Sequence, residues 1–293
     1  MLKIKIQHYV PKLYLRNFST KMKSNYIINC FDKSEQKIFL TKIENIGCEK
    51  YFYNTSNDIN QSIEKQFGNW ESTLKSAYDE IIETEDFKKL STLKFKSIAL
   101  FFIIQYCRTK ESRERIKDMV KQVKEKLSKN KLSNDLEKQL VDINSEETIK
   151  QMHIASILSM IRNGMKIIPF MKWILIKNKT SMPFWTSDNP VTLYNPLNFS
   201  PFGNLGLKNR GIQLYFPLSP NLTLLICDPE NYRLLPSFIY ADDKENIIFQ
   251  NSLQVFWSTR HIFSIDDDFS LAYKVLQKCP EYKDFNRKRI SVT

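Results

Sequence analysis

Glycine is scarce in this chain of 293 residues, which contains only six. Glycine-rich loops let the backbone approach a bound phosphate closely, yet neither GxGxxG nor GxxxxGK[ST] occurs in the sequence. The sequence therefore excludes the two commonest loops that hold dinucleotides and nucleoside triphosphates.

Cysteine and histidine are also sparse, and their spacing does not favour a metal site. The five cysteines include no CxxC pair, and His8, His153 and His261 show no HxxxH spacing. The N-terminus lacks the continuous apolar stretch of a secretory signal. These features predict reduced thiols and a cytoplasmic location. The acidic runs Asp242-Asp243 and Asp266-Asp267-Asp268 could bind a divalent metal, although their spacing is not that of a nuclease.

No hydrophobic run is long enough to cross a membrane. The segment SIALFFIIQYC, residues 97–107, has about half of the roughly 20 residues that a spanning helix needs. Residues 154–176 are interrupted by charged side chains and a proline. Both segments are expected to be buried elements of a soluble fold, without a transmembrane segment.

Positive charge is in excess, with a formal net charge of +12, and it is clustered. Residues 1–31 carry a net +6, residues 110–131 a net +5 and residues 283–293 a net +3. Such clusters favour a polyanionic partner, above all nucleic acid. Solvated charged faces and a low-GC codon bias explain the same composition, and nothing in the sequence indicates a protein partner.

Hydrophobic periodicity predicts an α+β fold, with N-terminal strands, a central group of helices and C-terminal strands in a mixed or antiparallel sheet. Residues 2–10 alternate as a strand that turns Ile4, Ile6 and His8 inward. Further strands are expected at 26–31 and 36–43 (a hairpin), 171–176, 182–188, 211–218, 222–227 and 260–265, followed by a basic tail. Helices are expected at 60–83, at 88–108, from there to about 127, and at 245–259, with a polar stretch at 129–138. A further helix is expected to begin after Ser145, its N-cap, and to end before Gly164. We expect one domain over residues 1–293, with a possible helical subdomain at 60–163.

Polar residues stand out in three of these segments. His8 is titratable and lies at a strand–helix junction, where it could act as a general base or be a satisfied, half-buried histidine. Gln105 and Arg108 end an apolar helix on one face, where they could bind a phosphate or form an internal clamp. Asp188 and Asn189 lie in a turn before proline, which fits a site or turn formation alone.

The other two histidines can likewise be structural or functional. His153 shares an apolar helical face and is expected to be a core residue, whereas His261 begins a strand and could be structural or functional. Asp188 could pair with Arg108 or with His8.

The segments QHYVPKLYLRNFS (7–19), QYCRT (105–109) and FWTSDNPV (184–191), the last followed by FPLSPNLTLLI (216–226), occur together in this order. This combination resembles the DUF4238 family of uncharacterised, mostly bacterial proteins, over roughly residues 7–265. The sequence departs from the family's motifs at two positions. Lys12 stands where arginine is expected, and Lys110 stands where proline is expected. The resemblance supplies no activity, but it implies a common centre at which the polar residues converge in one cleft: His8, Gln105, Arg108, Asp188 and Asn189.

The residue types and the clustered charge favour a nucleic-acid-directed hydrolase, RNase- or DNase-like, acting in bacterial conflict or phage defence. In this hypothesis His8 transfers protons, Arg108 stabilises phosphate charge and Asp188 orients His8 or holds a metal. Binding contacts would come from Gln105, Asn189, Lys12 and Arg16. The alternatives are a non-catalytic module that binds nucleic acid, a nucleotide signal or a protein partner, and a protein whose polar cluster is only structural.

Overall fold

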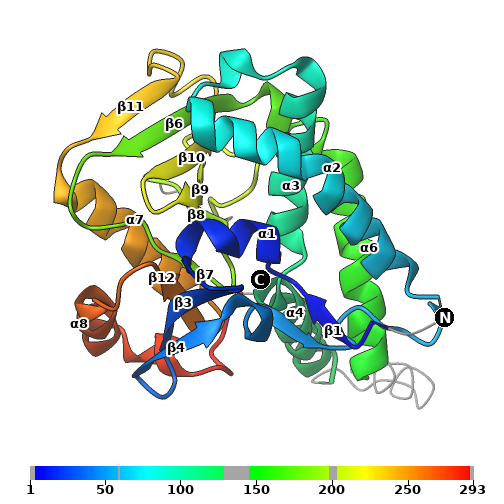
Figure 1. Cartoon of the computed structure of the whole chain (residues 1–293). Coiled ribbons are helices and arrows are strands. Elements are labelled where there is room, and N and C mark those ends of the chain that lie inside the picture. The colour runs from blue at the N-terminus through cyan, green and yellow to red at the C-terminus, as the bar shows by residue number, and fades with distance from the viewer. Residues whose placement is uncertain (1–3, 59, 129–144, 198–202, 291–293) are drawn as a thin grey trace.

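Two larger β-sheets and a group of long helices form the α+β fold of this protein (Figure 1). The structure is a computed structural model that describes residues 4–58, 60–128, 145–197 and 203–290. The predicted polar stretch at 129–138 lies outside these residues. In Figure 1 the helices α2, α3 and α6 lie together on the right, and the strands β6, β9, β10 and β11 lie to their left.

The first sheet has the strand order β11-β6-β10-β9-β8 and is mixed, because β11 runs parallel to β6 while the other pairs are antiparallel. Its strand β10 is buried at every position, as its continuous apolar sequence LTLLIC requires. The strands of this sheet are β6 (Lys172–Asn178), β8 (Thr192–Tyr194), β9 (Gln213–Ser219), β10 (Leu222–Cys227) and β11 (Phe238–Ala241).

The second sheet has the order β2-β3-β12-β7, with β4 also paired to β3. The predicted hairpin is confirmed, because β3 and β4 pair in antiparallel register from Ile27–Lys42 to Asp32–Lys37. The strands are β2 (Thr20–Met22), β3 (Asn25–Asp32), β4 (Lys37–Lys42), β7 (Thr186–Ser187) and β12 (His261–Ser264). Separately, β1 (Ile6–His8) pairs with β5 (Cys48–Lys50).

The long helices follow the predicted periodicity closely. The C-terminal half of the helix α3 is apolar nearly all round and buried, from Ile98 to Cys107, and Ser91 caps the N-terminus by accepting a hydrogen bond from the Lys94 amide. Ser145 caps α6 in the same way, as predicted. The helices are α1 (Lys12–Leu15), α2 (Ser62–Thr84), α3 (Thr92–Cys107), α4 (Lys110–Ser128), α6 (Glu146–Gly164), α7 (Lys244–Trp257) and α8 (Ser270–Lys278).

Two details of the predicted fold are wrong. The basic tail was expected to follow the last strand directly, but the helix α8 lies between them. The face of the first strand is reversed, because Ile4 and Ile6 are exposed whereas Gln7 is fully buried. Gln7 can be buried because Asn54 Oδ1 accepts a hydrogen bond from its amide, while its own Oε1 accepts one from the Tyr53 backbone.

In the part of the chain that the structure describes, no helix combines the length and the apolar character that crossing a membrane requires. The apolar segment at 97–107 is instead the buried half of α3, whose side chains join the largest hydrophobic core. That core contains residues from Tyr9 to Phe263, so strands and helices contribute to it together.

Gly47 holds the N-terminal segment in place, since its carbonyl accepts hydrogen bonds from the amides of Tyr9 (2.8 Å) and Val10 (3.0 Å). Its φ is +61°, and an added Cβ would lie 2.8 Å from Val10 Cβ. We expect Gly47→Ala to lower the free energy of unfolding by at least about 1–2 kcal/mol, the cost of left-handed backbone for alanine. Urea denaturation measures this.

Gly68 provides a matched control, because it is an exposed residue within α2 and an added Cβ meets no atom within 4 Å. Gly68→Ala should stabilise the protein by about 0.5–1 kcal/mol. Equal effects of the two alanines would contradict the role given to Gly47.

Candidate functional site

The three motif segments lie side by side and are joined by hydrogen bonds. The carbonyls of His8 and Tyr9 accept hydrogen bonds from the side chains of Arg108 and Gln105, respectively. The Thr109 hydroxyl donates to Asn189 Oδ1 at 2.7 Å. The segments therefore share one centre, although their polar side chains point to different places within it.

Arg108 lies in the interior and forms a clamp, at the wall of a small pocket of about 70 Å³ that Phe67 and Glu71 also line. Its side chain is 2% exposed, and Nη1 donates to Glu71 Oε1 at 2.9 Å. Its guanidinium also lies over the Phe67 ring, 4.4 Å from the centroid, and Nε donates to the Tyr53 hydroxyl. Arg108 thus pairs with Glu71 and not with Asp188.

His8 is half-buried at the end of β1, and its ring nitrogen Nε2 is buried without a hydrogen-bond partner in the described chain. Burial, together with the positive charges of Lys12 and Arg108, lowers the pKa of the His8 imidazole to about 4. His8 does not contribute to the cleft that Asp188 lines. The structure therefore does not bring His8, Arg108 and Asp188 into one pocket.

The lowered pKa of His8 makes a testable link between pH and stability. The native state keeps the imidazole neutral, whereas the unfolded chain binds a proton below pH 6.5, so stability is lost as the pH falls from 6.5 to about 4. We expect His8→Asn to reduce this loss by roughly 1–3 kcal/mol. Urea unfolding of both proteins across this pH range measures it, and parallel curves would contradict the prediction.

The other predicted binding residues have separate positions. Lys12 and Arg16 are exposed on the first helical turns, and the Arg16 guanidinium lies over the Tyr26 ring. Gln105 is fully buried and its Oε1 has no partner in the described residues. Asn189 is buried and donates from Nδ2 to the Trp257 carbonyl at 2.9 Å. The five polar residues of the motifs do not line one cleft.

Asp188 organises the loop that connects α7 to β12. It is 1% exposed, and its carboxylate accepts hydrogen bonds from three consecutive backbone amides: Thr259 at 2.7 Å, Arg260 at 2.8 Å and His261 at 2.8 Å. Three donors on one buried carboxylate form a strong, charge-assisted set of contacts. Asp188 therefore fixes the backbone from which Arg260 and His261 project.

A cleft of about 360 Å³ opens in front of this loop. Each of the three motif segments contributes to the wall of the cleft, either directly or through the residue next to it: these residues are Tyr9, Lys110 and Asp188. The remaining lining residues are Asn45, Ile46, Gly47, Cys48, Glu49, Thr259, Arg260, His261 and Phe285. Among the pockets of the described residues, this cleft is the one that all three motif segments, or residues next to them, reach together.

His261 brings an imidazole, which can transfer protons, to the cleft. Its imidazole is 26% exposed, with Nε2 3.6 Å from Asp32 Oδ2 and Nδ1 4.0 Å from Asp188 Oδ2. Arg260 donates from Nε to the same Asp32 oxygen at 2.8 Å. Burial alone would raise the pKa of Asp32, but His261 and Arg260 outweigh it and hold that pKa well below its usual range. Asp32 is thus a carboxylate that can orient the imidazole.

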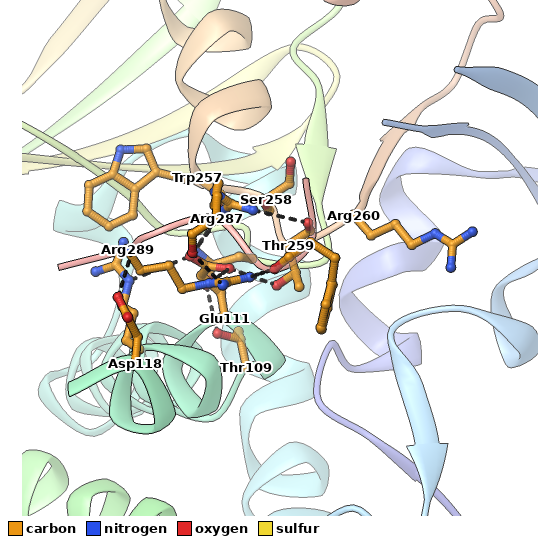
Figure 2. A network of polar contacts seen from close by, with 12 residues as sticks. Thr109, Glu111, Asp118, Trp257, Ser258, Thr259, Arg260, Arg287 and Arg289 are labelled. Carbon is orange, nitrogen blue, oxygen red and sulfur yellow. Dashed lines mark hydrogen bonds and ion pairs between the residues drawn. The ribbon is translucent and has the colours of Figure 1, made fainter. Parts of the chain in front are cut away.

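The same loop is held from behind by a buried polar network (Figure 2). Lys33 Nζ donates to the carbonyls of Val255 and Ser258, and Arg287 also donates to the Ser258 carbonyl, at 2.9 Å. Glu111 accepts a hydrogen bond from the Thr259 hydroxyl at 3.2 Å. Asp188 and this network both hydrogen-bond to the loop. The backbone from which the His261 side chain extends into the cleft is therefore held in place.

Sequence reasoning found Asp188 but left His261 and Asp32 without a role. The sequence leaves His261 open between a structural and a functional role, and it gives no signal for Asp32. The available signal was the Arg-His pair at the start of a predicted strand, which placed one titratable group at an element end.

Among the described residues, no group of three or more histidine, cysteine or acidic side chains could hold a metal ion. The two acidic runs have other contacts. Asp243 accepts a hydrogen bond from the Glu245 amide and caps α7, and Asp268 accepts one from the Ser270 amide. His153, expected in the core, is fully buried, with its Nδ1 near the Arg113 guanidinium.

The fold and the cleft together define an α+β protein with a histidine–carboxylate pair where three motif segments meet. The chain matches the family model described as "Protein of unknown function (DUF4238)" over residues 6–268, and it belongs to this family. Neither the curated proteins nor the solved structures gave a significant match.

Proposed function

We propose that this protein is a nucleic-acid-directed phosphodiester hydrolase whose proton-transferring group is His261. The observation that carries the proposal is the half-exposed imidazole of His261 in the cleft, with a carboxylate of Asp32 at 3.6 Å and the cation of Arg260 beside it. A positioned imidazole and a nearby cation supply the two needs of phosphodiester cleavage, proton transfer and anion stabilisation.

The chemistry assigns one task to each side chain. The His261 imidazole takes a proton from the attacking water or hydroxyl as the new P–O bond forms. The leaving oxygen takes a proton from a solvent water as the old P–O bond breaks, and the imidazolium then gives its proton to the hydroxide that this leaves. Arg260 and Lys110 stabilise the negative charge on the phosphate. Asp32 positions the imidazole, whereas Asp188 acts through the backbone of the loop.

The clustered positive charge supports a polyanionic substrate. The C-terminal segment lies along α4, since Asp118 Oδ2 accepts hydrogen bonds from the amides of Arg289 and Ile290. Two of the three basic segments are therefore neighbours in space, although Arg287 and Arg289 are turned inward. The five cysteines are all free, which supports the proposed cytoplasmic location. A role in bacterial conflict or phage defence is part of the proposal and is not tested by the thiols.

The test compares two histidine variants on labelled single- and double-stranded RNA and DNA. We expect His261→Ala to lower the cleavage rate by about 10²–10⁴-fold, because it removes the general base. His8→Ala is the matched control, since His8 lies outside the cleft, and it should keep most of the activity. Thermal melting of each variant confirms that it is folded.

The opposite pattern, with activity lost in His8→Ala and kept in His261→Ala, would return the catalytic role to His8. Cleavage by wild type that EDTA abolishes would show that a metal takes part, which contradicts a mechanism built on side chains alone.

A second candidate is a non-catalytic module that binds nucleic acid, a nucleotide signal or a protein partner. The observation in its favour is that both cations of the cleft are already paired, Lys110 with Glu49 and Arg260 with Asp32. Salt-sensitive binding without turnover, unchanged in His261→Ala, would favour this candidate over the hydrolase.

A further inference from the structure

A second, smaller pocket of about 150 Å³ lies behind the wall of the cleft. The wall is formed by adjacent residues of the same segments: Asp188 and Thr259 line the cleft, whereas Asn189 and Trp257 line the second pocket. The pocket is smaller than sites that enclose a whole drug-sized ligand, which measure about 300–1,000 Å³. Its size suits a small ion or one end of a larger molecule.

Arg115, from α4, is the only charged residue that lines this pocket. The other lining residues are neutral: Tyr106, Cys107, Ser112, Ile116, Ser156, Met160, Asn189, Val191 and Trp257. The Arg115 side chain is 31% exposed, yet its Nε is buried and makes no hydrogen bond within the described chain. Because Nε is closed to solvent, an anion in the pocket would be held by the exposed part of the Arg115 side chain.

The nearest carboxylate does not satisfy Arg115, because other groups already occupy it. Glu111 Oε1 lies 3.8 Å from Arg115 Nε, which is beyond hydrogen-bonding distance. Glu111 instead accepts hydrogen bonds from Arg287 at 3.2 Å, from Arg289 at 3.1 Å and from the Thr259 hydroxyl at 3.2 Å (Figure 2). One carboxylate therefore faces three guanidinium groups, and positive charge is left over beside the pocket.

Trp257 holds the Arg115 guanidinium in a defined position. The guanidinium carbon lies 4.2 Å from the centroid of the indole ring, a distance typical of a stacked cation–π contact. Stacking covers one face of the guanidinium and leaves its edge, which carries the N–H donors, available to an acceptor. Tyr106 lines the same pocket.

We propose that this pocket binds a phosphate group, held by the edge of the Arg115 guanidinium. Arginine binds phosphate oxygens through two parallel N–H donors, and the absence of any lining carboxylate avoids repulsion of the anion. The phosphate is either free inorganic phosphate or the terminal phosphate of a nucleotide whose remainder lies outside the pocket. This site is separate from the cleft and does not depend on the hydrolase proposal.

Calorimetric titration at constant ionic strength tests the site with inorganic phosphate, adenosine 5′-monophosphate and adenosine. We expect Arg115→Gln to weaken phosphate binding by at least about 10-fold, because the donor edge and the charge are lost. Lys121→Gln is the matched control, since it removes the same charge from the same helix but lines a different pocket. It should change the affinity by less than about 2-fold.

The two phosphate sources are distinguished by their relative affinities. Equal affinities for phosphate and the nucleotide identify free phosphate as the ligand, and a much tighter nucleotide identifies the terminal phosphate. Absence of binding to wild type, equal weakening by Arg115→Gln and Lys121→Gln, or binding of adenosine as tight as that of the nucleotide would each overturn the proposal.

Met160→Glu gives a second variant in case Arg115→Gln does not fold. Met160 lines the pocket and is only partly buried, so a carboxylate there would neutralise Arg115 and repel the anion. Phosphate binding should then be lost. Binding that persists in Met160→Glu at wild-type affinity would overturn the proposal.

Discussion

Replacement of Arg108 by methionine is expected to lower the free energy of unfolding by about 3–5 kcal/mol, the cost of removing one partner from a buried ion pair. Methionine retains much of the side-chain volume but leaves the Glu71 carboxylate, the Tyr53 hydroxyl and the His8 carbonyl without their common donor. Equilibrium unfolding in urea, followed by circular dichroism, measures the loss.

Lys75→Met is the control for this prediction, because Lys75 forms an exposed pair with Asp79 on the surface of α2. Exposed pairs of this kind contribute about 0.2–1 kcal/mol at most. A loss below about 1 kcal/mol for Arg108→Met would show that Arg108 is not a structural clamp, and it would reopen a direct role for Arg108 in binding a ligand.

Replacement of Asp188 by alanine is expected to have a comparable effect, about 3–5 kcal/mol, for a different reason. The substitution leaves three consecutive backbone amides, from Thr259 to His261, without their shared acceptor. Beyond the global loss of stability, these amides should exchange with deuterium faster than those of β10. Hydrogen-exchange mass spectrometry, together with thermal melting, measures both effects.

Asp243→Ala serves as the comparison, because Asp243 caps α7 from an exposed position. Loss of such a cap costs about 1 kcal/mol. If Asp188→Ala were no more destabilising than Asp243→Ala, and left exchange in the loop unchanged, Asp188 would not be the organiser of the loop.

The helices and the main strands could be predicted because their signals are local. The 3.6-residue period of α2 and α4, the serine cap of α6 and the turn between β3 and β4 are each contained in a short window of sequence. The face of β1 could not be predicted, since alternation shows that two faces differ but not which one is covered. Burial of Gln7 depends on acceptors and donors at Tyr53 and Asn54, which belong to another segment.

The candidate site was predictable only in part, for a related reason. The motif segments could be recognised in the sequence, and they do meet in the structure. The partners of their side chains could not be predicted, because tertiary packing brings together residues that are far apart in the sequence. Arg108 reaches Glu71 on α2, and His261 lies beside Asp32 at the end of β3. Spacing along the chain contains no information about these choices.

The buried contacts of Arg287 and Arg289 have a practical consequence for cloning. The family match ends at residue 268, whereas both arginines lie beyond it and hydrogen-bond to the buried Glu111. A protein that ended at residue 268 would lack Arg287 and Arg289. The buried Glu111 carboxylate would then lose both of these partners, next to the loop that carries His261. Expression vectors for this family member should therefore extend at least to Ile290, and affinity tags at the C-terminus need a linker.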